Sequence, residues 1–430
     1  MSVVGPMPRQ DRDLGDLRAV VFATTPLGIF QQSLALQERG QLGMMAVDFY
    51  CDLSRLPYSL VPAGKVRSQL AKRMLPQLDP RRVRIRPLPS VALRLGASLL
   101  RTRERRQQGV FWVNGRFDAW VASRLEAFGN LAFGYESASL FTFRRAKALG
   151  IPTVLYQPIM CAEVAVALLA EEAERFPELA DTLRYNWFPP EEIERRHEER
   201  ELADVIVCAS TATRRSLIEV GVPAHKIVVE PYGVDQEVFS PSTDKLDRFS
   251  VIWASSFTQT KGMGYLLEAL VRDPVPGLEL VLAGYPAYGA DAVVPYEDRV
   301  QVRRLGKIGR PELGRVMRRC HVHVFPTIVE GFGRNIIEAM ASGLPVITTP
   351  NGAGPDLIED GVTGFIVPIR DVDGICEKLA WIADHPAEAA AMGQRASDRV
   401  ATLTPADYRM RFADRIGDVW TAKRVSTTHV

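Results

Sequence analysis

The chain has 430 residues, of which 47% are hydrophobic and 24% charged, and a formal net charge of +2. This length and apolar content predict two domains with separate cores. The near-zero net charge argues against a general affinity for nucleic acid. The five cysteines are scattered and form no CxxC pair, which argues against a disulfide framework or a zinc site and favours a reducing compartment.

The first twenty residues contain no apolar signal-peptide core, and no apolar run approaches the length of a membrane span. We therefore expect a cytoplasmic protein. The charge is unevenly distributed, because residues 61–110 hold thirteen Lys and Arg against two acids. This basic segment is either an ordinary solvated surface, balanced by the acidic stretch 163–201, or a surface that meets anionic lipid headgroups or an anionic acceptor at the membrane periphery.

Strands and helices are predicted to alternate in the first half. Arg18–Thr25 is the first expected strand, a Pro26-Leu27-Gly28 turn follows, and Phe30–Arg39 is a helix. Gly28 would let the backbone approach a ligand at the end of this strand. The other strands expected here are Gly109–Val113, Leu131–Tyr135, Thr153–Tyr156, Asp204–Cys208 and Lys226–Glu230. The other helices are Ser139–Leu149, Pro189–Leu202 and Ser210–Val220.

A second alternation follows the polar stretch Ser240–Lys245, which is the best linker candidate. Its expected strands are Ser250–Ser255, Leu278–Ala283, Val300–Leu305, Val322–Pro326 and Pro345–Thr348. Two such series indicate an α/β protein with two doubly wound, Rossmann-like parallel sheets that face a cleft. We place the N-terminal domain at 1–240 and the C-terminal domain at 241–404, with a final helix over Pro405–Lys423.

The segment from His321 to Pro355 carries the strongest functional signal. A Gly-bearing loop follows its first strand, a short helix is expected over Asn335–Ser342, and Leu344–Thr349 is a second apolar run. Such a βαβ unit directs loop amides and a helix N-terminus to the carboxyl edge of a parallel sheet, where anionic ligands bind. Two carboxylates, Glu330 and Glu338, lie eight positions apart around that loop.

The residues from Glu330 to Glu338, EGFGRNIIE, resemble the E-x7-E signature of the retaining GT-B glycosyltransferases of family 4. The resemblance spans roughly residues 198–370. It continues through Ala203–Val207 (ADVIV), Pro231–Asp235 (PYGVD), Ala339–Gly343 (AMASG), Pro345–Ile347 (PVI) and Gly361–Phe365 (GVTGF). An isolated pair of glutamates would be a weak signal, whereas this ordered series is a strong one. It implies a GT-B fold whose last helix, in 405–430, crosses back to the N-terminal domain.

The resemblance also implies roles for individual residues. Glu330 would hold hydroxyls of the donor sugar, and Glu338 would hold the ribose hydroxyls. Lys261 would face the departing diphosphate, because a helix dipole supplies only about 0.3–2 kcal/mol of the 8 kcal/mol or more that catalysis needs. The remaining donor-binding positions that it implies are Gly28, Ser256, Gly306 (beside the nucleobase), Gly331, Phe332, Gly333, Arg334, Asn335 and Ile336.

Two positions depart from the family pattern. Ser256 stands where the family has an arginine that accompanies the lysine, and Arg334 could compensate for the missing charge. Glu330, Lys261 and Gln157 are the three candidate catalytic residues. Gln157 stands where the family commonly has a histidine, so the side chain at this position cannot titrate. Glu136 is either an alternative carboxylate in the cleft or a surface residue.

Several structural alternatives stay open. Lys261 could be a solvated lysine, and Glu338 could form a surface pair with Arg334, one helical turn before it. His321 and His323 alternate with valines in one strand, so both share a face and are expected to pack against a neighbouring helix. No spacing of carboxylates and histidines indicates a metal site.

We expect a retaining glycosyltransferase that moves a sugar from a nucleoside-diphosphate sugar to a hydroxyl acceptor in glycan, glycolipid or polysaccharide biosynthesis. No metal or other cofactor is expected, and no nucleic acid partner. The acceptor could be lipid-linked or anionic. The alternatives are a nucleotide-sugar-binding protein with little transferase activity and a GT-B enzyme that epimerises or hydrolyses its nucleotide sugar, which the fold alone does not separate.

Overall fold

A computed structural model describes residues 14–428 except 25–27, 54–59, 63, 65–66, 68–69, 72, 97–101, 184–187 and 287–290. The predicted residues Pro26 and Leu27 of the first turn, and Lys65, Lys72 and Arg101 of the basic segment, lie outside the described residues.

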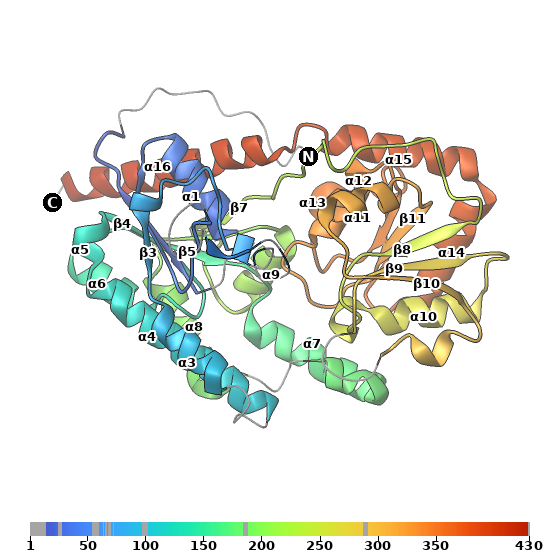
Figure 1. Ribbon diagram of the computed structural model, residues 1–430, viewed down its shortest axis with the longest axis horizontal. Helices are drawn as coiled ribbons and strands as arrows, with labels where there is room; N and C mark the ends of the chain where they lie inside the picture. Colours follow the sequence, from blue (N-terminus) through green and yellow to red (C-terminus); the bar gives the residue numbers. More distant parts are fainter. Residues whose placement is uncertain are drawn as a thin grey trace.

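The named strands of the described chain form two parallel sheets (Figure 1). The first sheet has the order β3-β2-β1-β4-β5-β6-β7 and the second has the order β10-β9-β8-β11-β12-β13. The strands of the first sheet are β1 Ala19–Ala23, β2 Leu42–Val47, β3 Val83–Ile85, β4 Leu131–Tyr135, β5 Thr153–Gln157, β6 Val205–Cys208 and β7 Ile227–Val229. Those of the second are β8 Ser250–Trp253, β9 Glu279–Ala283, β10 Gln301–Gly306, β11 Val322–Phe325, β12 Val346–Thr348 and β13 Phe365–Ile366.

Helices cover both faces of the sheets. In the first half they are α1 Ile29–Glu38, α3 Pro87–Gly96, α4 Arg103–Ala122, α5 Leu125–Phe128, α6 Leu140–Ala148, α7 Ala162–Arg175, α8 Pro190–Leu202 and α9 Thr211–Glu219. In the second half they are α10 Met263–Arg272, α11 Arg310–Met317, α12 Arg334–Ala341, α13 Gly354–Leu357, α14 Val372–Asp384, α15 Pro386–Val400 and α16 Pro405–Thr428. Short 3-10 helices are η2 Pro80–Arg82, η3 Pro177–Thr182, η5 Ala224–Lys226, η6 Gln259–Lys261 and η7 Val294–Tyr296.

Burial on both faces explains why the central strands are apolar without alternation. Every residue of β1 is buried, and so is every residue of β4, β5 and β8. One apolar cluster joins the first sheet to α1 and α16, and a second joins its other face to α4, α6 and α9. The predicted pair of doubly wound parallel sheets is therefore confirmed.

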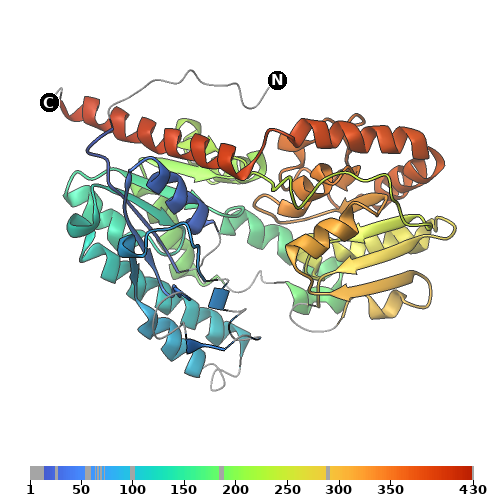
Figure 2. The same ribbon diagram turned by 45° about the horizontal axis from the view of Figure 1, so that its top comes forward.

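The final helix, α16, lies along the first half of the molecule although it follows the second in sequence (Figure 2). The ring of Phe412 contacts that of Phe133 on β4, with the centroids 5.2 Å apart. Arg409 forms an ion pair with Glu38 at the end of α1, at 2.9 Å. The return of the last helix to the first half is thus confirmed.

The two crossings of the chain lie together. The amide of Val234 donates to the carbonyl of Leu403 at 2.8 Å, and a Cβ added to Gly233 would lie 2.2 Å from the carbonyl oxygen of Thr404. The polar stretch 240–246 then runs along the second half, where Pro241 packs on Gly343. The domain limits at 240 and 404 stay a prediction.

One predicted strand is wrong. Gly109–Val113 lies inside the helix α4, which Thr102 caps by accepting from the amide of Arg105 at 3.2 Å. The run of β-branched and aromatic residues suggested a strand. The helix forms because Val113, Phe117 and Val121 recur every four residues and bury one face. Strands β2, β3 and β13 were not predicted, whereas the other predicted elements differ from the observed ones only at their ends.

Candidate functional site

The candidate site lies where the order of the second sheet reverses, between β8 and β11. In open parallel sheets, ligands bind outside the carboxyl ends of the strands at this switch point. After β8 the chain enters the η6 turn, and after β11 it enters the loop that precedes α12. The sequence-predicted residues of both connections meet here.

The helix α12 begins at the loop with an open N-terminus. Its N-cap is Gly333, with a φ of 80° that suits glycine, and no side chain of the described structure caps the helix. The first amides of such a helix, and the positive end of its dipole, attract an anion. Asn335 in the first turn donates from Nδ2 to the carbonyl of Ala254 at 3.4 Å, which ties this turn to the end of β8.

An ion pair joins the two connections. The Nζ atom of Lys261 lies 2.6 Å from Oε2 of Glu330 and also donates to the carbonyl of Val329 at 3.3 Å. Glycine at position 262 makes this approach possible, because a Cβ there would lie 2.0 Å from the carbonyl oxygen of Pro326. Both charged side chains remain 18% exposed, so the pair is accessible to solvent. Lys261 is therefore neither free nor merely solvated.

Glu338 pairs with a residue that the sequence did not indicate. Its Oε1 accepts from Nη1 of Arg310 on α11 at 2.5 Å. Burial raises the pKa of this carboxyl, and the Arg310 guanidinium opposes that rise. The alternative of a surface pair between Glu338 and Arg334 is wrong, because the Glu338 side chain is only 7% exposed and the Arg334 guanidinium lies 4.6 Å above the ring of Tyr232.

An aromatic and hydroxyl cluster continues from Arg334 into the first half. The ring of Phe332 contacts that of Tyr232, with the centroids 5.2 Å apart, and the Tyr232 hydroxyl is hydrogen-bonded to that of Tyr156. Gly28 borders this cluster, because a Cβ on it would lie 2.8 Å from the hydroxyl of Tyr135. Tyr232 therefore links Gly28, whose added Cβ would lie 3.6 Å from the Tyr232 hydroxyl, to Phe332 of the E-x7-E loop.

Residues of the first half also hydrogen-bond to the backbone of Gly331. Its carbonyl accepts from the hydroxyls of Ser210 and of Thr213, the latter at 3.2 Å. A Cβ on Gly331 would lie 2.0 Å from the carbonyl oxygen of Pro158. The sequence predicts Ser210 only as the start of a helix, and it does cap that helix, because its Oγ accepts from the Thr213 amide at 3.2 Å. A serine hydroxyl at a helix start can accept from a helix amide and donate to another group at the same time. This property was the only sequence signal for the contact with Gly331.

Gln157 lies at the end of β5, one residue before Pro158. It is fully buried, its Nε2 donates to the carbonyl of Ile159 at 2.9 Å, and its Oε1 has no hydrogen-bond partner among the described residues. Ser256 is half-buried and follows β8. Gly306, with a φ of 65°, ends β10 and is exposed. Ile336 is buried in the core beneath α12. Their ligand-binding roles stay predictions.

Glu136 is neither in the cleft nor on the surface. It is buried, with Oε2 2.8 Å from Nη1 of Arg196 and Oε1 3.5 Å from Nη1 of Arg200, both on α8. Buried charges of this kind require such partners. Nearby, Glu199 is fully buried and accepts from the amides of Ser137, Ser139 and Leu140.

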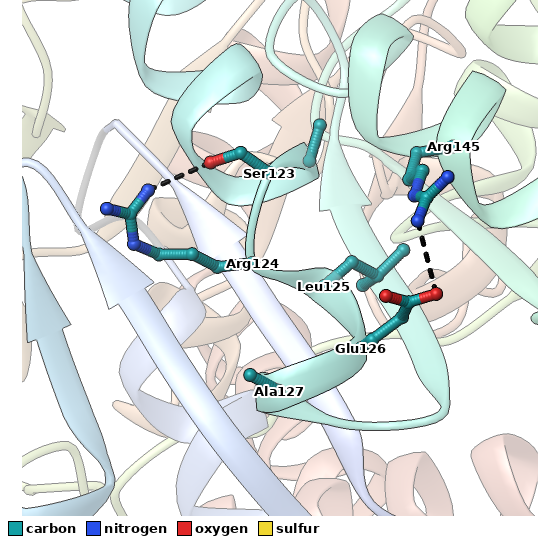
Figure 3. A pocket seen from close by; sticks show the side chains of 7 residues that line it. Ser123, Arg124, Leu125, Glu126, Ala127 and Arg145 are labelled. Atoms are coloured by element: carbon teal, nitrogen blue, oxygen red, sulfur yellow. Dashed lines mark hydrogen bonds and ion pairs between the residues drawn. The ribbon is translucent and has the colours of Figure 1, made fainter.

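Two cavities of the described surface lie away from this site. One, of about 510 Å³, is lined by Arg124, Leu125, Glu126 and Arg145 among others, and the Glu126–Arg145 and Ser123–Arg124 contacts cross its wall (Figure 3). The other, of about 500 Å³, is lined by residues of the 242–246 stretch, β10 and α11. Neither contains a residue of the E-x7-E loop, so cavity size does not locate the chemistry here.

No described helix has the length and apolar character needed to cross a bilayer, and no three His, Cys, Asp or Glu side chains among the described residues are grouped as metal ligands. All five cysteines are buried and free.

The two facing parallel sheets and the returning last helix define a GT-B protein. The fold is shared with HepE of Anabaena, solved with UDP-glucose (TM-score 0.62, 16% identity, 94% of this chain and 100% of that one). It is shared as well with sucrose-phosphate synthase of Thermosynechococcus elongatus (TM-score 0.65, 17% identity, 94% and 100%).

Within this fold, residues 248–385 match the family described as Glycosyl transferases group 1. The chain is 30% identical over 222 residues to a D-inositol 3-phosphate glycosyltransferase of Mycolicibacterium paratuberculosis. That match covers 47% of this chain and 50% of the relative, so it spans about half the length of the relative.

Proposed function

We propose that the protein is a retaining glycosyltransferase that moves a sugar from a nucleoside-diphosphate sugar to a hydroxyl acceptor. The Lys261–Glu330 ion pair beside the open N-terminus of α12 carries the proposal. It combines a cation for a phosphate with a carboxylate that can accept hydrogen bonds from sugar hydroxyls. The group 1 domain and the named activity of its relative support the same conclusion.

The donor is expected to bind across α12. Its diphosphate would lie at the first amides of α12 and displace the Lys261 ammonium from Glu330, which would leave that carboxylate free for the sugar. The ribose hydroxyls would donate to Glu338, which is already fixed by Arg310. The UDP-glucose complex of HepE, which shares the fold, supports a nucleotide sugar as the ligand.

The reaction then needs no titrating side chain at Gln157. The bond between the anomeric carbon and the phosphate oxygen breaks while the acceptor oxygen bonds to the same face of that carbon, and the acceptor proton passes to the leaving phosphate oxygen. The positive charges around the diphosphate stabilise the negative charge that develops on it. Gln157 would orient the sugar by hydrogen bonds, since its Oε1 has no other partner among the described residues.

We further propose an acceptor that is anionic or lipid-linked, bound by the first half. Two buried guanidinium nitrogens near the carboxyl ends of β2 and β3 have no hydrogen-bond partner among the described residues, namely Nη1 of Arg73 and Nε of Arg86. Arg73 Nη1 forms a long ion pair with Oδ1 of Asp48, at 3.7 Å, which is beyond hydrogen-bond distance. A phosphate or carboxylate on the acceptor would satisfy such groups.

The basic segment supports peripheral contact with a membrane. Around its arginines the surface exposes apolar side chains, with Ile85 41%, Leu88 71% and Val91 41% exposed. Cations beside exposed apolar groups are the combination that binds an anionic lipid surface.

The test is to incubate the purified protein with UDP-, GDP- and ADP-sugars, with and without lipid extract, and to measure the nucleoside diphosphate released. Release that depends on acceptor, with a product whose anomeric configuration matches the donor by NMR, is the expected result. Tight nucleotide binding without turnover under every condition would instead indicate a binding protein. Release or epimerisation without acceptor would indicate the hydrolase or epimerase alternative.

A further inference from the structure

One element of the first half of the sequence packs on the second half. Helix α7 and the η3 turn that follows it lie along the lower side of the second half, next to α10 (Figure 1). The apolar side chains of Leu169, Phe176 and Leu179 belong to the core of the second half and not to that of the first. The rings of Phe176 and Tyr265 on α10 meet edge to face, with the centroids 5.0 Å apart.

A carboxylate lies at the centre of this contact. Glu172 of α7 is fully buried, and three side chains of the second half donate to it. Its Oε2 accepts from Nε2 of Gln259 at 2.7 Å and from the hydroxyl of Tyr265 at 2.8 Å. Its Oε1 accepts from Nε of Arg370 at 2.7 Å. Arg370 holds a φ of 71°, which a non-glycine residue adopts only when its surroundings require it.

Gln259 links this carboxylate to the candidate site. It is the first residue of η6, the turn that carries Lys261. The Gln259 side chain is fixed at both ends, because its Oε1 accepts from the amide of Gly264 at 2.9 Å while its Nε2 donates to Glu172. Its own amide donates to Oγ1 of Thr182 in η3 at 3.0 Å. Both attachments from α7 and η3 therefore hold the η6 backbone two residues before Lys261.

We propose that Glu172 is a positioning residue for glycosyl transfer, which acts through Gln259 to fix Lys261 against the leaving diphosphate. This inference rests on the proposed function and assigns to α7 a task beyond packing. A displacement of about 1 Å in a catalytic group can cost about 100-fold in rate. With the η6 backbone held in place, the Lys261 ammonium that has turned to the bound diphosphate needs no further rearrangement as charge develops. Glu172 does not touch the substrate in this arrangement.

The chain offers a matched control. Glu171 precedes Glu172 and pairs with the same arginine, with Oε2 2.5 Å from Nη1 of Arg370. Its side chain is 55% exposed, and it touches neither Gln259 nor Tyr265 in the described contacts. Glu171→Gln therefore removes the same charge from the same helix without disturbing η6.

The experiment compares Glu172→Gln, Glu171→Gln and Gln259→Met with the natural protein, by thermal unfolding and by the kcat and KM for the donor. Glu172→Gln and Gln259→Met are expected to lower kcat about 10- to 100-fold and to leave KM within about 3-fold, because the lysine acts on charge that forms during the reaction. Glu171→Gln is expected to keep the natural kcat. The double variant Glu172→Gln/Gln259→Glu, which exchanges the carboxylate and the amide, is expected to recover part of the lost kcat.

Wild-type kcat in folded Glu172→Gln would overturn the inference, and so would an equal loss in Glu171→Gln. If Glu172→Gln fails to fold, Gln259→Met decides, because it keeps the Glu172–Arg370 pair, and a natural kcat in that variant would overturn the inference. If the natural protein itself transfers no sugar, the proposed function fails first. The two failures are distinguishable, because a failure of the proposed function shows in the natural protein, whereas a failure of the inference shows only in the variants.

Discussion

The ammonium of Lys261 lies 2.6 Å from the carboxylate of Glu330, a residue 69 positions later in the chain. The two arrive from different connections of one sheet, at the point where its strand order reverses. In the proposed function, a phosphate would become the partner of Lys261 and a sugar hydroxyl the partner of Glu330.

Lys261→Ala is expected to lower kcat by about 100- to 1,000-fold, the usual cost of removing one group that stabilises developing charge. The KM for the donor should rise less, because the interaction strengthens only as the leaving group departs. Steady-state kinetics of nucleoside diphosphate release measures both. A glycosyl fluoride donor provides the control, since it has no diphosphate, and an equal loss with that donor would contradict the role of the lysine.

Glu338→Ala is expected to weaken the binding of the free nucleoside diphosphate about 10- to 100-fold. The variant loses hydrogen bonds to a charged group, each worth about 1.5–3 kcal/mol, and leaves Arg310 without its carboxylate. Isothermal titration calorimetry gives the dissociation constant directly. Glu359→Ala is the control, because Glu359 lies in the same half with its side chain 60% exposed. Unchanged affinity in Glu338→Ala would remove the ribose assignment.

Gly331→Ala tests the contact between the two halves. Its Cβ would lie 2.0 Å from the Pro158 carbonyl oxygen and 3.1 Å from Cα of Ile159, so one of the loops must move. We expect a destabilisation of about 1–3 kcal/mol, as for other overpacked sites, and at least a tenfold loss of turnover. Gly309→Ala is the control, because the nearest atom to its Cβ would be 3.9 Å away. A natural melting temperature and natural activity in Gly331→Ala would show that the loops accommodate the methyl group.

The double variant Arg81→Ala/Arg84→Ala is expected to reduce binding to vesicles of anionic phospholipid, most strongly at low salt. Both arginines are exposed, whereas Arg82 is left intact because its guanidinium binds the carbonyl of Leu42. Vesicle sedimentation at two salt concentrations measures the effect. The variant Arg272→Ala/Arg299→Ala removes the same charge from the second half, and equal loss there would mean that only net charge matters.

Stability is expected to fall as the pH drops from about 6.5 to about 4, in part because of His323. Burial lowers the pKa of this ring to about 4, and its Nδ1 donates to the carbonyl of Ile252 at 2.9 Å, so the folded protein holds it neutral. Between the two pKa values the unfolded chain binds the extra proton, which stabilises the unfolded state by up to about 3 kcal/mol at the acid end. In His323→Phe, the free energy of unfolding should depend less steeply on pH over this range. An identical pH dependence in both proteins would rule out this contribution.

The sequence predicted which loop and helix meet at the candidate site, but it did not predict the partners of their side chains. The position of Glu330 at the carboxyl edge of the sheet and the helix start near Arg334 followed from the βαβ pattern. The spacing of apolar residues and the positions of glycines determine such local structure. The pairing of Glu338 with Arg310 did not, since 28 positions separate them and only the fold brings α11 beside α12. The strand error at Gly109–Val113 arose because local preference favoured a strand while tertiary burial favoured a helix.

The placement of α7 shows a second limit. The sequence showed residues 163–201 as an acidic stretch and did not predict that a helix there packs on the second half. The buried Glu172 was equally invisible, because an isolated glutamate in a helix looks like a solvated residue until Gln259, Tyr265 and Arg370 are seen around it.

The position of α16 has a consequence for synthesis on the ribosome. The aromatic face that Phe133 shares with Phe412 is completed only by α16, which is translated after the strands of both sheets. The second sheet and its helices leave the ribosome before α16 and can assemble first. Until α16 follows, the N-terminal half exposes an apolar surface. Nascent chains stalled before residue 405 should therefore recruit chaperones to the half that was made first.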